Sequence, residues 1–409
     1  MKRVAVIFES SPFDRKGLFN AVHNRVKSLL DTGECWVDAY CIHSRDNAFT
    51  RAVRHTSYAP DVDSVEIDGI TYRMLWYRFS IMDHVSLEKF GKRPFLFRGF
   101  VRRNLSYLEG YDCIIAHSFT GALFAYEASR RYGIPFFVNW HGSDVHTHPW
   151  RVPVILEDTR MIMESAQCNF FVSRALMAAS EMITENARKE VLYNGVSEDF
   201  VPFDETARAK ARAKFGIPSD AKVVAFVGNL LPVKNVMSLP SIFSSVAALY
   251  HSPESASESP LHFVIAGDGK LRKPLESAFN SCPELSHPER GDVSTTLLGN
   301  VPSEVMPALM NCIDVLVLPS LNEGLPLVCA EALRCGANVV GSDVGGIAEV
   351  IGHENVVPLG ESFDKNMAEK IVHMLSDKPS QPLPSYISWE KTSEIELSFL
   401  QSAELLGES

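Results

Sequence analysis

The sequence predicts an α/β protein with two domains, each built around a parallel β-sheet. Short apolar runs alternate with helix-length amphipathic segments throughout its 409 residues, which is the pattern that parallel sheets produce. This length exceeds what one hydrophobic core commonly serves. A new series of strands starts at Lys222, after a charged segment that Pro202 and Pro218 flank. We therefore expect domains at residues 1–200 and 201–387.

The strands are expected where apolar, β-branched and aromatic residues cluster between turn-forming residues. A hairpin is also expected at Val65–Leu75, because Asp68-Gly69 at its centre suits a two-residue turn. In the first domain the predicted strands are Arg3–Glu9, Trp36–Ile42, Asp112–Ser118, Pro135–Trp140, Cys168–Ser173 and Glu190–Tyr193. In the second domain they are Lys222–Gly228, Leu261–Ala266, Thr295–Leu298, Ile313–Leu318, Asn338–Gly341 and Asn355–Pro358.

Bulk composition narrows the functional classes. The net charge of −11 arises entirely after residue 200, and such an acidic half argues against nucleic-acid binding. The apolar run after Met1 is interrupted at Glu9, so we interpret it as a strand and not as an export signal. The eight Cys show no metal-site spacing, and Asp61-Val-Asp63 is interpreted as a solvated loop. We expect a cytoplasmic protein with reduced thiols, no metal and no cofactor.

Glu323 and Glu331 form the most informative pair in the chain. A buried strand precedes Glu323, and Glu331 falls inside the helix that follows. The start of such a helix offers unpaired backbone N–H groups to a phosphate, and a carboxylate accepts hydrogen bonds from sugar or ribose hydroxyls. This combination suits a nucleotide sugar. The predicted anion cradle between the two carboxylates comprises Gly324, Leu325, Pro326, Leu327 and Val328.

The same segment resembles the Glu-x7-Glu motif of the retaining glycosyltransferases of family 4 (GT4). The resemblance extends to Pro319-Ser-x-x-Glu-Gly-x-Pro-Leu, to Glu-Ala-Leu-x-x-Gly and to Gly345-Gly-Ile-Ala-Glu349. It implies the GT-B fold, in which two Rossmann-like domains face each other across a cleft. It also implies that a C-terminal helix, within residues 388–409, crosses back to complete the N-terminal domain.

The resemblance assigns the nucleotide sugar to the second domain. Lys234 is expected to hold the diphosphate and Glu323 to face the donor sugar, while Glu331 accepts the ribose hydroxyls. Asn229 stands where the family pattern has Arg, so one charged phosphate contact is replaced by a neutral one. Further donor-binding candidates are Gly228, Gly267 after the next strand, and Val301 beside the base.

The first domain is expected to bind the acceptor. Trp140-His-Gly-Ser-Asp144 follows a strand and resembles the family's His-Gly-x-Asp segment. It makes His141 a catalytic candidate beside the donor sugar and Asp144 a contact of the acceptor or the cleft. Gly17 matches a family glycine in the first strand–helix loop, near the donor phosphates.

The basic and aromatic run at residues 88–103 allows two interpretations. It is either a surface that contacts anionic lipid at the inner face of the membrane or an aromatic stripe that faces the core under a solvated basic face.

The expected reaction is retaining transfer from a nucleoside diphosphate sugar, with UDP favoured over GDP. The acceptor is a hydroxyl of a carbohydrate or of a lipid-linked molecule, in polysaccharide or glycolipid assembly. Two alternatives stay open, a GT-B sugar-nucleotide epimerase and a catalytically silent sugar-binding or scaffold subunit.

Overall fold

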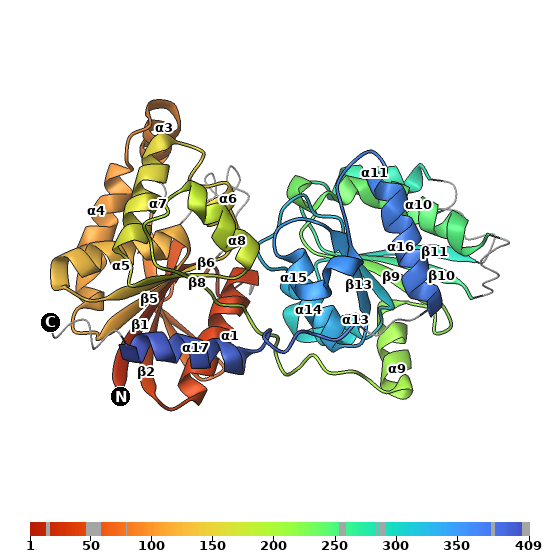
Figure 1. Ribbon diagram of the computed structural model, residues 1–409, viewed down its shortest axis with the longest axis horizontal. Coiled ribbons are helices and arrows are strands. Elements are labelled where there is room, and N and C mark those ends of the chain that lie inside the picture. Colours follow the sequence, from red (N-terminus) through yellow and green to blue (C-terminus); the bar gives the residue numbers. More distant parts are fainter. Residues whose placement is uncertain are drawn as a thin grey trace. The chain divides into compact units, whose positions relative to one another are not determined.

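The computed structural model describes residues 1–13, 17–45, 59–78, 80–252, 259–282, 285, 292–377 and 381–402. The chain divides into two compact units (Figure 1). Unit 1 comprises Met1–Gly195 with Ser388–Ser409, and unit 2 comprises Val196–Ile387. The chain thus leaves unit 1 at Gly195, close to the predicted limit at residue 200. Most of the predicted loops 251–260 and 281–292 lies outside the described residues.

Unit 1 contains an eight-stranded sheet in the order β3-β4-β2-β1-β5-β6-β7-β8. All of its described pairings are parallel except β3 with β4. Its predicted strands are confirmed, with ends shifted by a few residues. The strands are β1 (Lys2–Glu9), β2 (Cys35–Ser44), β3 (Ser64–Ile67), β4 (Ile70–Tyr77), β5 (Cys113–His117), β6 (Phe136–Trp140), β7 (Cys168–Phe171) and β8 (Lys189–Val191).

The β3–β4 pair is the predicted hairpin. Asp68 and Gly69 connect the two strands with φ angles of 50° and 77°. Positive φ at both central residues is what the favoured two-residue hairpin turn requires, and Asp-Gly is among the sequences that supply it.

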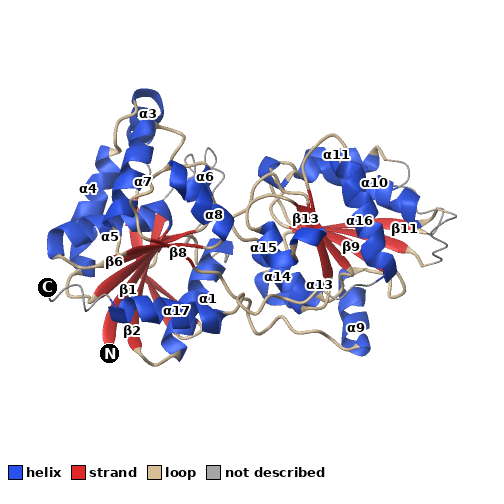
Figure 2. Cartoon of the chain, in the orientation of Figure 1, coloured by secondary structure: helices blue, strands red, loops and turns tan. Residues whose placement is uncertain are grey.

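Helices cover both faces of the unit 1 sheet (Figure 2). Val4, Val6 and Phe8 of β1 belong to a core with residues of α1 and α17. On the other face α5 lies very close to β1, because a Cβ on Gly121 would be 2.4 Å from the Ile7 carbonyl oxygen. The helices of unit 1 are α1 (Gly17–Asp31), α3 (Ile81–Phe90), α4 (Phe95–Asn104), α5 (Ser118–Tyr132), α6 (Ser143–His146), α7 (Pro153–Ser165), α8 (Arg174–Ala179) and α17 (Trp389–Ser402).

The C-terminal helix α17 returns to unit 1, as the GT-B resemblance implies. Its Thr392 hydroxyl donates to the Tyr193 carbonyl oxygen at 2.6 Å. Deeper in the unit, Glu396 Oε1 lies 3.8 Å from Arg25 Nη1 of α1, and both side chains are at most 2% exposed. Arg25 also donates to Asn139 of β6 and, at 3.0 Å, to Asn194. A buried charge network therefore anchors α17.

Unit 2 contains a six-stranded sheet in the order β11-β10-β9-β12-β13-β14, and its described pairings are parallel. If the six strands β9 to β14 are numbered 1 to 6, the order across the sheet is 3-2-1-4-5-6, which is the strand order of the Rossmann fold. The predicted strands are again confirmed, although β12 begins two residues after Ile313. They are β9 (Lys222–Val227), β10 (Leu261–Ala266), β11 (Val293–Gly299), β12 (Val315–Leu318), β13 (Asn338–Ser342) and β14 (Val356–Val357).

Asp314, which directly precedes β12, belongs to an ion-pair cluster. Its carboxylate pairs with Arg208 at 2.9 Å and with Arg212 at 3.0 Å, and it accepts the Val223 backbone amide at 2.8 Å. The residue therefore serves an ion-pair cluster ahead of the strand. The helices of unit 2 are α9 (Glu205–Phe215), α10 (Leu239–Tyr250), α11 (Arg272–Asn280), α13 (Met306–Met310), α14 (Leu327–Arg334), α15 (Ile347–Ile351) and α16 (Phe363–Asp377).

The buried Arg25–Glu396 pair predicts a large loss of stability in a single variant. Burial lowers the pKa of Arg25 and raises the pKa of Glu396, so each charge depends on the other. Glu396→Leu leaves the guanidinium buried without its counter-charge and is expected to cost about 3 kcal/mol in the free energy of unfolding. Urea unfolding followed by circular dichroism measures this loss.

The matched control is Glu394→Leu, an exposed position on the same helix, which should leave the urea midpoint nearly unchanged. The double variant Arg25→Met/Glu396→Leu should recover most of the loss, because it removes both buried charges. Equal midpoints for Glu396→Leu and Glu394→Leu would show that the pair does not anchor α17.

Candidate active site

The sheet topology of unit 2 creates a natural ligand position beside β9. The strand order reverses there, since β10 follows on one side and β12 on the other. Loops at such a switch point leave the carboxyl ends of the strands in opposite directions and make room for a ligand. The loop after β9 carries Lys234, and the loop after β12 carries Glu323. The Leu321 backbone amide donates to the Val233 carbonyl oxygen at 2.8 Å and joins the two loops.

Lys234 and Glu323 meet at this position. Lys234 Nζ donates to Glu323 Oε1 at 2.5 Å, and the Ser320 hydroxyl donates to the same oxygen at 2.7 Å. The Lys234 side chain is 23% exposed and the Glu323 side chain 9%. The two catalytic candidates of this unit are thus brought together although 89 positions separate them in the chain.

Two glycines allow the loops to approach this closely. Gly345 has a φ of 52°, and a Cβ on it would be 1.9 Å from the Glu323 carbonyl oxygen. The next amide, of Gly346, donates to the Gly324 carbonyl oxygen at 3.1 Å. A Cβ on Gly267 would be 1.9 Å from the Gly228 carbonyl oxygen. A larger residue at Gly345 or Gly267 would have to displace backbone, so these glycines fix the loops around Lys234 and Glu323.

Helix α14 begins at Leu327, immediately after the Glu323 loop. The first-turn N–H groups of an α-helix have no acceptor within the helix, and the helix dipole places positive charge around them. Leu327 and Val328 lie in that turn. Pro326 has no N–H, so it cannot be one of the donors in the predicted cradle. Instead, its carbonyl oxygen accepts the Cys329 amide at 3.0 Å and opens the helix.

Glu331 lies in the second turn of α14 and is partly buried. Burial raises the pKa of its carboxyl group to about 7. Within the described part of the chain, the carboxylate has no hydrogen-bond partner. Even partial burial of a carboxylate without a partner is unfavourable, and hydroxyl groups of a ligand would relieve that cost.

The other donor-binding candidates follow the same strand ends. Gly228 and Asn229 come directly after β9, and Asn229 is exposed. Gly267 ends β10, and its amide donates to Gly299 at 2.7 Å. Val301 follows β11 and packs against the core of unit 2. Because β11 is two strands away from β9, Val301 is the outlying member of the set.

In unit 1, His141 lies at the carboxyl end of β6 beside His117, which ends β5. His117 Nδ1 and His141 Nε2 are 3.0 Å apart, and the rings stack with centroids 5.3 Å apart. Burial, followed by the charge of Arg25, lowers the pKa of His141 to about 3. Both rings are therefore neutral at pH 7, and one donates to the other.

Asp144 holds the loop that presents His141. Its Oδ1 accepts the His141 amide at 3.1 Å and the Gly142 amide at 2.9 Å. Burial raises the pKa of this carboxyl group to about 6, while the amides act in the opposite direction. Its carboxylate is thus directed to backbone groups of its own loop. Gly17 is the first residue of α1, and a Cβ there would meet nothing within 4 Å, so packing does not require a glycine at this helix start.

Sequence reasoning missed two polar residues at these strand ends. His117 was predicted only as part of a strand, although adjacent parallel strands end at one sheet edge and His141 ends the neighbouring strand. Glu9 ends β1, where it accepts the Tyr77 hydroxyl at 2.9 Å and the Thr120 hydroxyl at 2.5 Å. The available signal was a polar residue at the carboxyl end of each predicted strand, Glu9 in Arg3–Glu9 and His117 in Asp112–Ser118.

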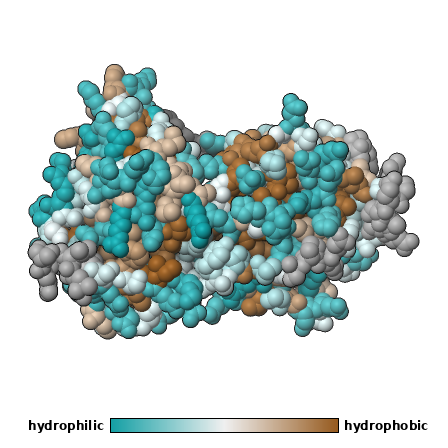
Figure 3. All heavy atoms as spheres, in the orientation of Figure 1, coloured by the Kyte–Doolittle hydropathy of each residue, from teal (hydrophilic) through white to brown (hydrophobic). Residues whose placement is uncertain are grey.

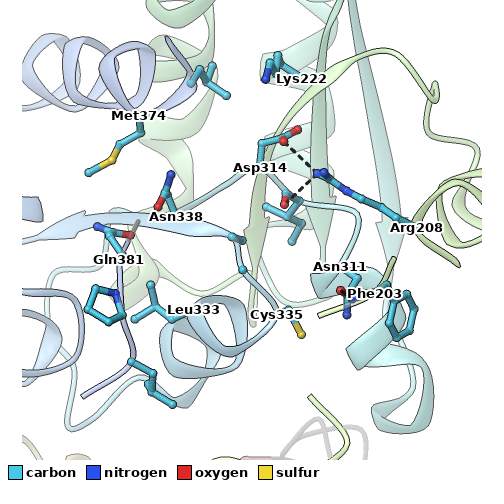
Figure 4. Close-up of a pocket in the computed structure, with 16 residues that line it drawn as sticks. Phe203, Arg208, Lys222, Asn311, Asp314, Leu333, Cys335, Asn338, Met374 and Gln381 are labelled. Carbon is cyan, nitrogen blue, oxygen red and sulfur yellow. Dashed lines mark hydrogen bonds and ion pairs between the residues drawn. The ribbon is translucent and has the colours of Figure 1, made fainter. Parts of the chain in front are cut away.

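A separate cavity of about 480 Å³ lies at the opposite edge of the unit 2 sheet (Figure 4). Lys222, Asp314 and Asn338, at the amino ends of three strands, help to line it. Its polar groups largely satisfy one another, as with Asp314 and Arg208, or the Gln381 amide that donates to Val339 at 3.0 Å. None of the predicted donor-binding residues lines this cavity.

The described residues include no group of three or more His, Cys, Asp or Glu placed to hold a metal ion. Among the same residues, no helix is long and apolar enough to cross a membrane.

Two protein families match the chain. Residues 37–195 match the family described as "Glycosyl transferase 4-like domain", and residues 207–388 match "Glycosyl transferases group 1". The chain belongs to the GT4-type glycosyltransferases with the GT-B fold. This membership agrees with the family that the resemblance of its motifs predicted.

Individual relatives are 25–27% identical to this chain over the regions that align. A putative teichuronic acid biosynthesis glycosyltransferase of Bacillus subtilis is 25% identical over 58% of this chain and 54% of its own length. A D-inositol 3-phosphate glycosyltransferase of Mycolicibacterium gilvum is 27% identical over 61% of this chain and 55% of its own. The chain thus spans about half the length of these two relatives. An uncharacterised glycosyltransferase of Methanocaldococcus jannaschii is 26% identical over 75% of this chain and 80% of its own.

Solved structures show the fold over the whole chain. Sucrose-phosphate synthase of Thermosynechococcus elongatus has a TM-score of 0.68 at 19% identity and covers 100% of this chain and 99% of its own. HepE of Anabaena, in complex with UDP and glucose, has a TM-score of 0.66 at 16% identity. The match covers 99% of this chain and 100% of the HepE chain.

The raised pKa of Glu331 predicts how stability depends on pH. Between pH 4.5 and 7 the folded protein keeps a proton that the unfolded chain has released, so stability falls as the pH rises through this window and levels off above it. Glu331→Gln removes the titration. Its stability relative to wild type should rise by about 2 kcal/mol from pH 5 to pH 8, as measured by urea unfolding at each pH.

Glu369→Gln is the matched control, since that carboxylate on α16 is 52% exposed and should leave the pH profile of wild type intact. If the free energy of unfolding of Glu331→Gln varied with pH in parallel with that of wild type, the raised pKa of Glu331 would be contradicted.

Proposed function

We propose that this glycosyltransferase moves a sugar from a nucleoside diphosphate sugar to a hydroxyl group of an acceptor, with the anomeric configuration retained. The observation that carries the proposal is the Lys234–Glu323 pair, which lies at the switch point of unit 2 directly before the start of α14. A cation, a helix amino terminus and a second carboxylate at Glu331 together match the diphosphate and the hydroxyls of such a donor.

Donor binding requires Lys234 to change partner. Without ligand its ammonium group is held by Glu323, so the charge is already positioned and largely desolvated. A diphosphate offers two or more negative charges and competes for the same ammonium group. When Lys234 turns to the phosphate, Glu323 Oε1 keeps the Ser320 hydroxyl, and the carboxylate regains acceptor capacity for a hydroxyl of the donor sugar. Glu331 then accepts the ribose hydroxyls.

The chemical step breaks the bond between the anomeric carbon and the β-phosphate oxygen. The acceptor oxygen forms its bond on the same face, and its proton passes to the departing phosphate. Negative charge grows on that phosphate in the transition state, where Lys234 and the amides of Leu327 and Val328 stabilise it. Burial keeps the imidazole of His141 in unit 1 neutral, so this catalytic candidate would offer a hydrogen bond without adding charge. No metal or cofactor takes part in this scheme.

UDP is favoured over GDP as the nucleotide. Support comes from HepE, whose structures hold UDP or UDP-glucose, and from a UDP-forming trehalose-phosphate synthase with a TM-score of 0.65. For the acceptor, the teichuronic acid and inositol phosphate relatives support a carbohydrate or polyol hydroxyl. We place the enzyme in the cytoplasm, in polysaccharide or glycolipid assembly.

Loss of the Lys234 charge should chiefly slow the chemical step. Removing one charge-stabilising group from a site of this kind costs about 3 kcal/mol, so Lys234→Ala should lower kcat by about a hundredfold or more. Release of UDP from UDP-sugars with an accepted hydroxyl compound measures the rate. Lys210→Ala is the matched control, because Lys210 is exposed on α9 of unit 2. Its kcat should equal that of wild type. Near-normal turnover in Lys234→Ala would remove Lys234 from the mechanism.

Nucleotide binding tests the donor site without an acceptor. Calorimetric titration should show that UDP binds more tightly than GDP or ADP, and that Lys234→Ala and Glu331→Ala lose most of this affinity. Because hydroxyl donors prefer the ionised Glu331, UDP affinity should rise as the pH increases through 7, and Glu331→Gln should lose this dependence. Absence of binding by any nucleotide would favour a silent scaffold, and release of an epimerised sugar without acceptor would favour an epimerase.

A further inference from the structure

Helices α3 and α4 carry the most apolar exposed side chains of unit 1. Met82 is 77% exposed and Phe90 68% on α3, while Phe95 on α4 is 80% exposed. Four basic residues share the exposed sides of the two helices and of the turn between them. We define the α3–α4 surface by Ile81, Met82, Phe90, Phe95 and Leu96 together with Lys89, Lys92, Arg102 and Arg103.

Among the apolar residues of α3, only Leu87 packs against a described core cluster. All ten residues of this helix are described, and none of them is buried. Its inner side contacts the protein through Leu87, which packs against Val152, Val154 and Ile155. At helical spacing Ile81 and Val85 lie one turn apart on the other side. With Met82, Ser86, Phe90 and Lys92 they line a shallow groove, so the apolar side of α3 faces outward.

Each of the two interpretations of residues 88–103 applies to some of the aromatic residues in this run. Phe100 is buried, with its ring centroid 5.7 Å from that of Phe124, and Phe97 packs on Tyr77 at 5.1 Å. These aromatic residues form the inward stripe. Phe90 and Phe95, however, point away from the core. Packing of the core does not explain the exposed Phe90 and Phe95.

Acidic groups near the surface are already engaged. Asp83 accepts the amides of Leu96 and Phe97 at 3.2 and 2.8 Å and thereby caps α4. Glu88 pairs with Arg151 at 2.9 Å. The inner cations Arg93 and Arg98 both pair with Asp158. The four basic residues of the α3–α4 surface have no ion-pair partner among the described residues, so the surface is locally positive on a chain of net charge −11.

We propose that the α3–α4 surface docks unit 1 on a bilayer that contains anionic lipid. Large apolar side chains beside lysines and arginines suit the interface of a membrane, where rings and thioethers enter the acyl boundary and the cations meet phosphate headgroups. Figure 3 shows apolar and hydrophilic residues mixed over the tip of unit 1 that α3 forms. Two of the four cations of the α3–α4 surface, Lys89 and Lys92, are lysines, a residue type that is depleted at protein–protein interfaces.

The proposal concerns attachment and does not depend on which sugar is transferred. It deepens the proposed function in one respect, since a docked enzyme meets acceptors that are themselves lipid-linked. Binding and turnover are measured separately, so failure of one leaves the other standing.

Vesicle flotation with the full-length protein tests the proposal. Wild type should bind vesicles of phosphatidylcholine mixed equally with phosphatidylglycerol, bind phosphatidylcholine alone far less, and dissociate in high salt. Each cation near an anionic surface strengthens binding about fivefold, so the variant Lys89→Gln/Lys92→Gln/Arg102→Gln/Arg103→Gln should bind at least about a hundredfold more weakly. Met82→Ser/Phe90→Ser/Phe95→Ser should also lose binding, in this case through lost apolar burial.

Matched controls lie outside the surface. Arg130→Gln/Arg131→Gln/Lys210→Gln/Lys214→Gln removes four exposed charges elsewhere, and Trp36→Ser removes an apolar side chain that is 64% exposed on β2. Both should bind like wild type, and all variants should keep the wild-type circular dichroism spectrum. Failure of wild type to float, or equal flotation of surface and control variants, would overturn the proposal. Self-association that only the surface variants lose would assign the surface to a second copy of the chain.

Discussion

The reversal of strand order beside the first strand of a parallel sheet is the constraint from which the site follows. In unit 2 it brings the loops after β9 and β12 together, because neighbouring strands end at one edge while their connections diverge. The close approach of these loops also requires Gly267 and Gly345, where a Cβ would collide with backbone. In unit 1 the sheet reverses beside β1 in the same way, and Glu9, His117 and His141 end β1 and its next neighbours on one side.

Buried charge is used differently in the two units. In unit 2 the Lys234–Glu323 pair is partly accessible, and we propose that a diphosphate replaces Glu323 as the partner of the ammonium group. In unit 1 the Arg25–Glu396 pair is buried, and it positions the C-terminal helix. It ties α17 to Asn139, two residues before His141, so the returning C-terminal helix supports the strand that presents this imidazole. The charge of Arg25 and burial together keep His141 neutral.

The strands, the hairpin and the Glu323–Glu331 segment could be predicted because their signals are local. Apolar periodicity marks strands, and Asp68-Gly69 marks a turn. What the sequence could not provide depends on contacts between distant segments. The His117–His141 pair and the Arg25–Glu396 network join residues 24 and 371 positions apart. Gly17 was matched to a loop but starts a helix, and Pro326 was grouped with amide donors although its ring removes the hydrogen. The apolar run from Ile313 to Leu318 also predicted a strand that starts two residues before β12.

A crystal structure of the protein with bound UDP tests the central claim most directly. The account predicts that the diphosphate lies within hydrogen-bond distance of Lys234 Nζ and of the first-turn amides of α14, with the ribose hydroxyls on Glu331. The Lys234–Glu323 contact should lengthen or be shared with a phosphate oxygen. UDP bound in the cavity near Asp314, or bound with the Lys234–Glu323 pair intact and the start of α14 untouched, would contradict the account.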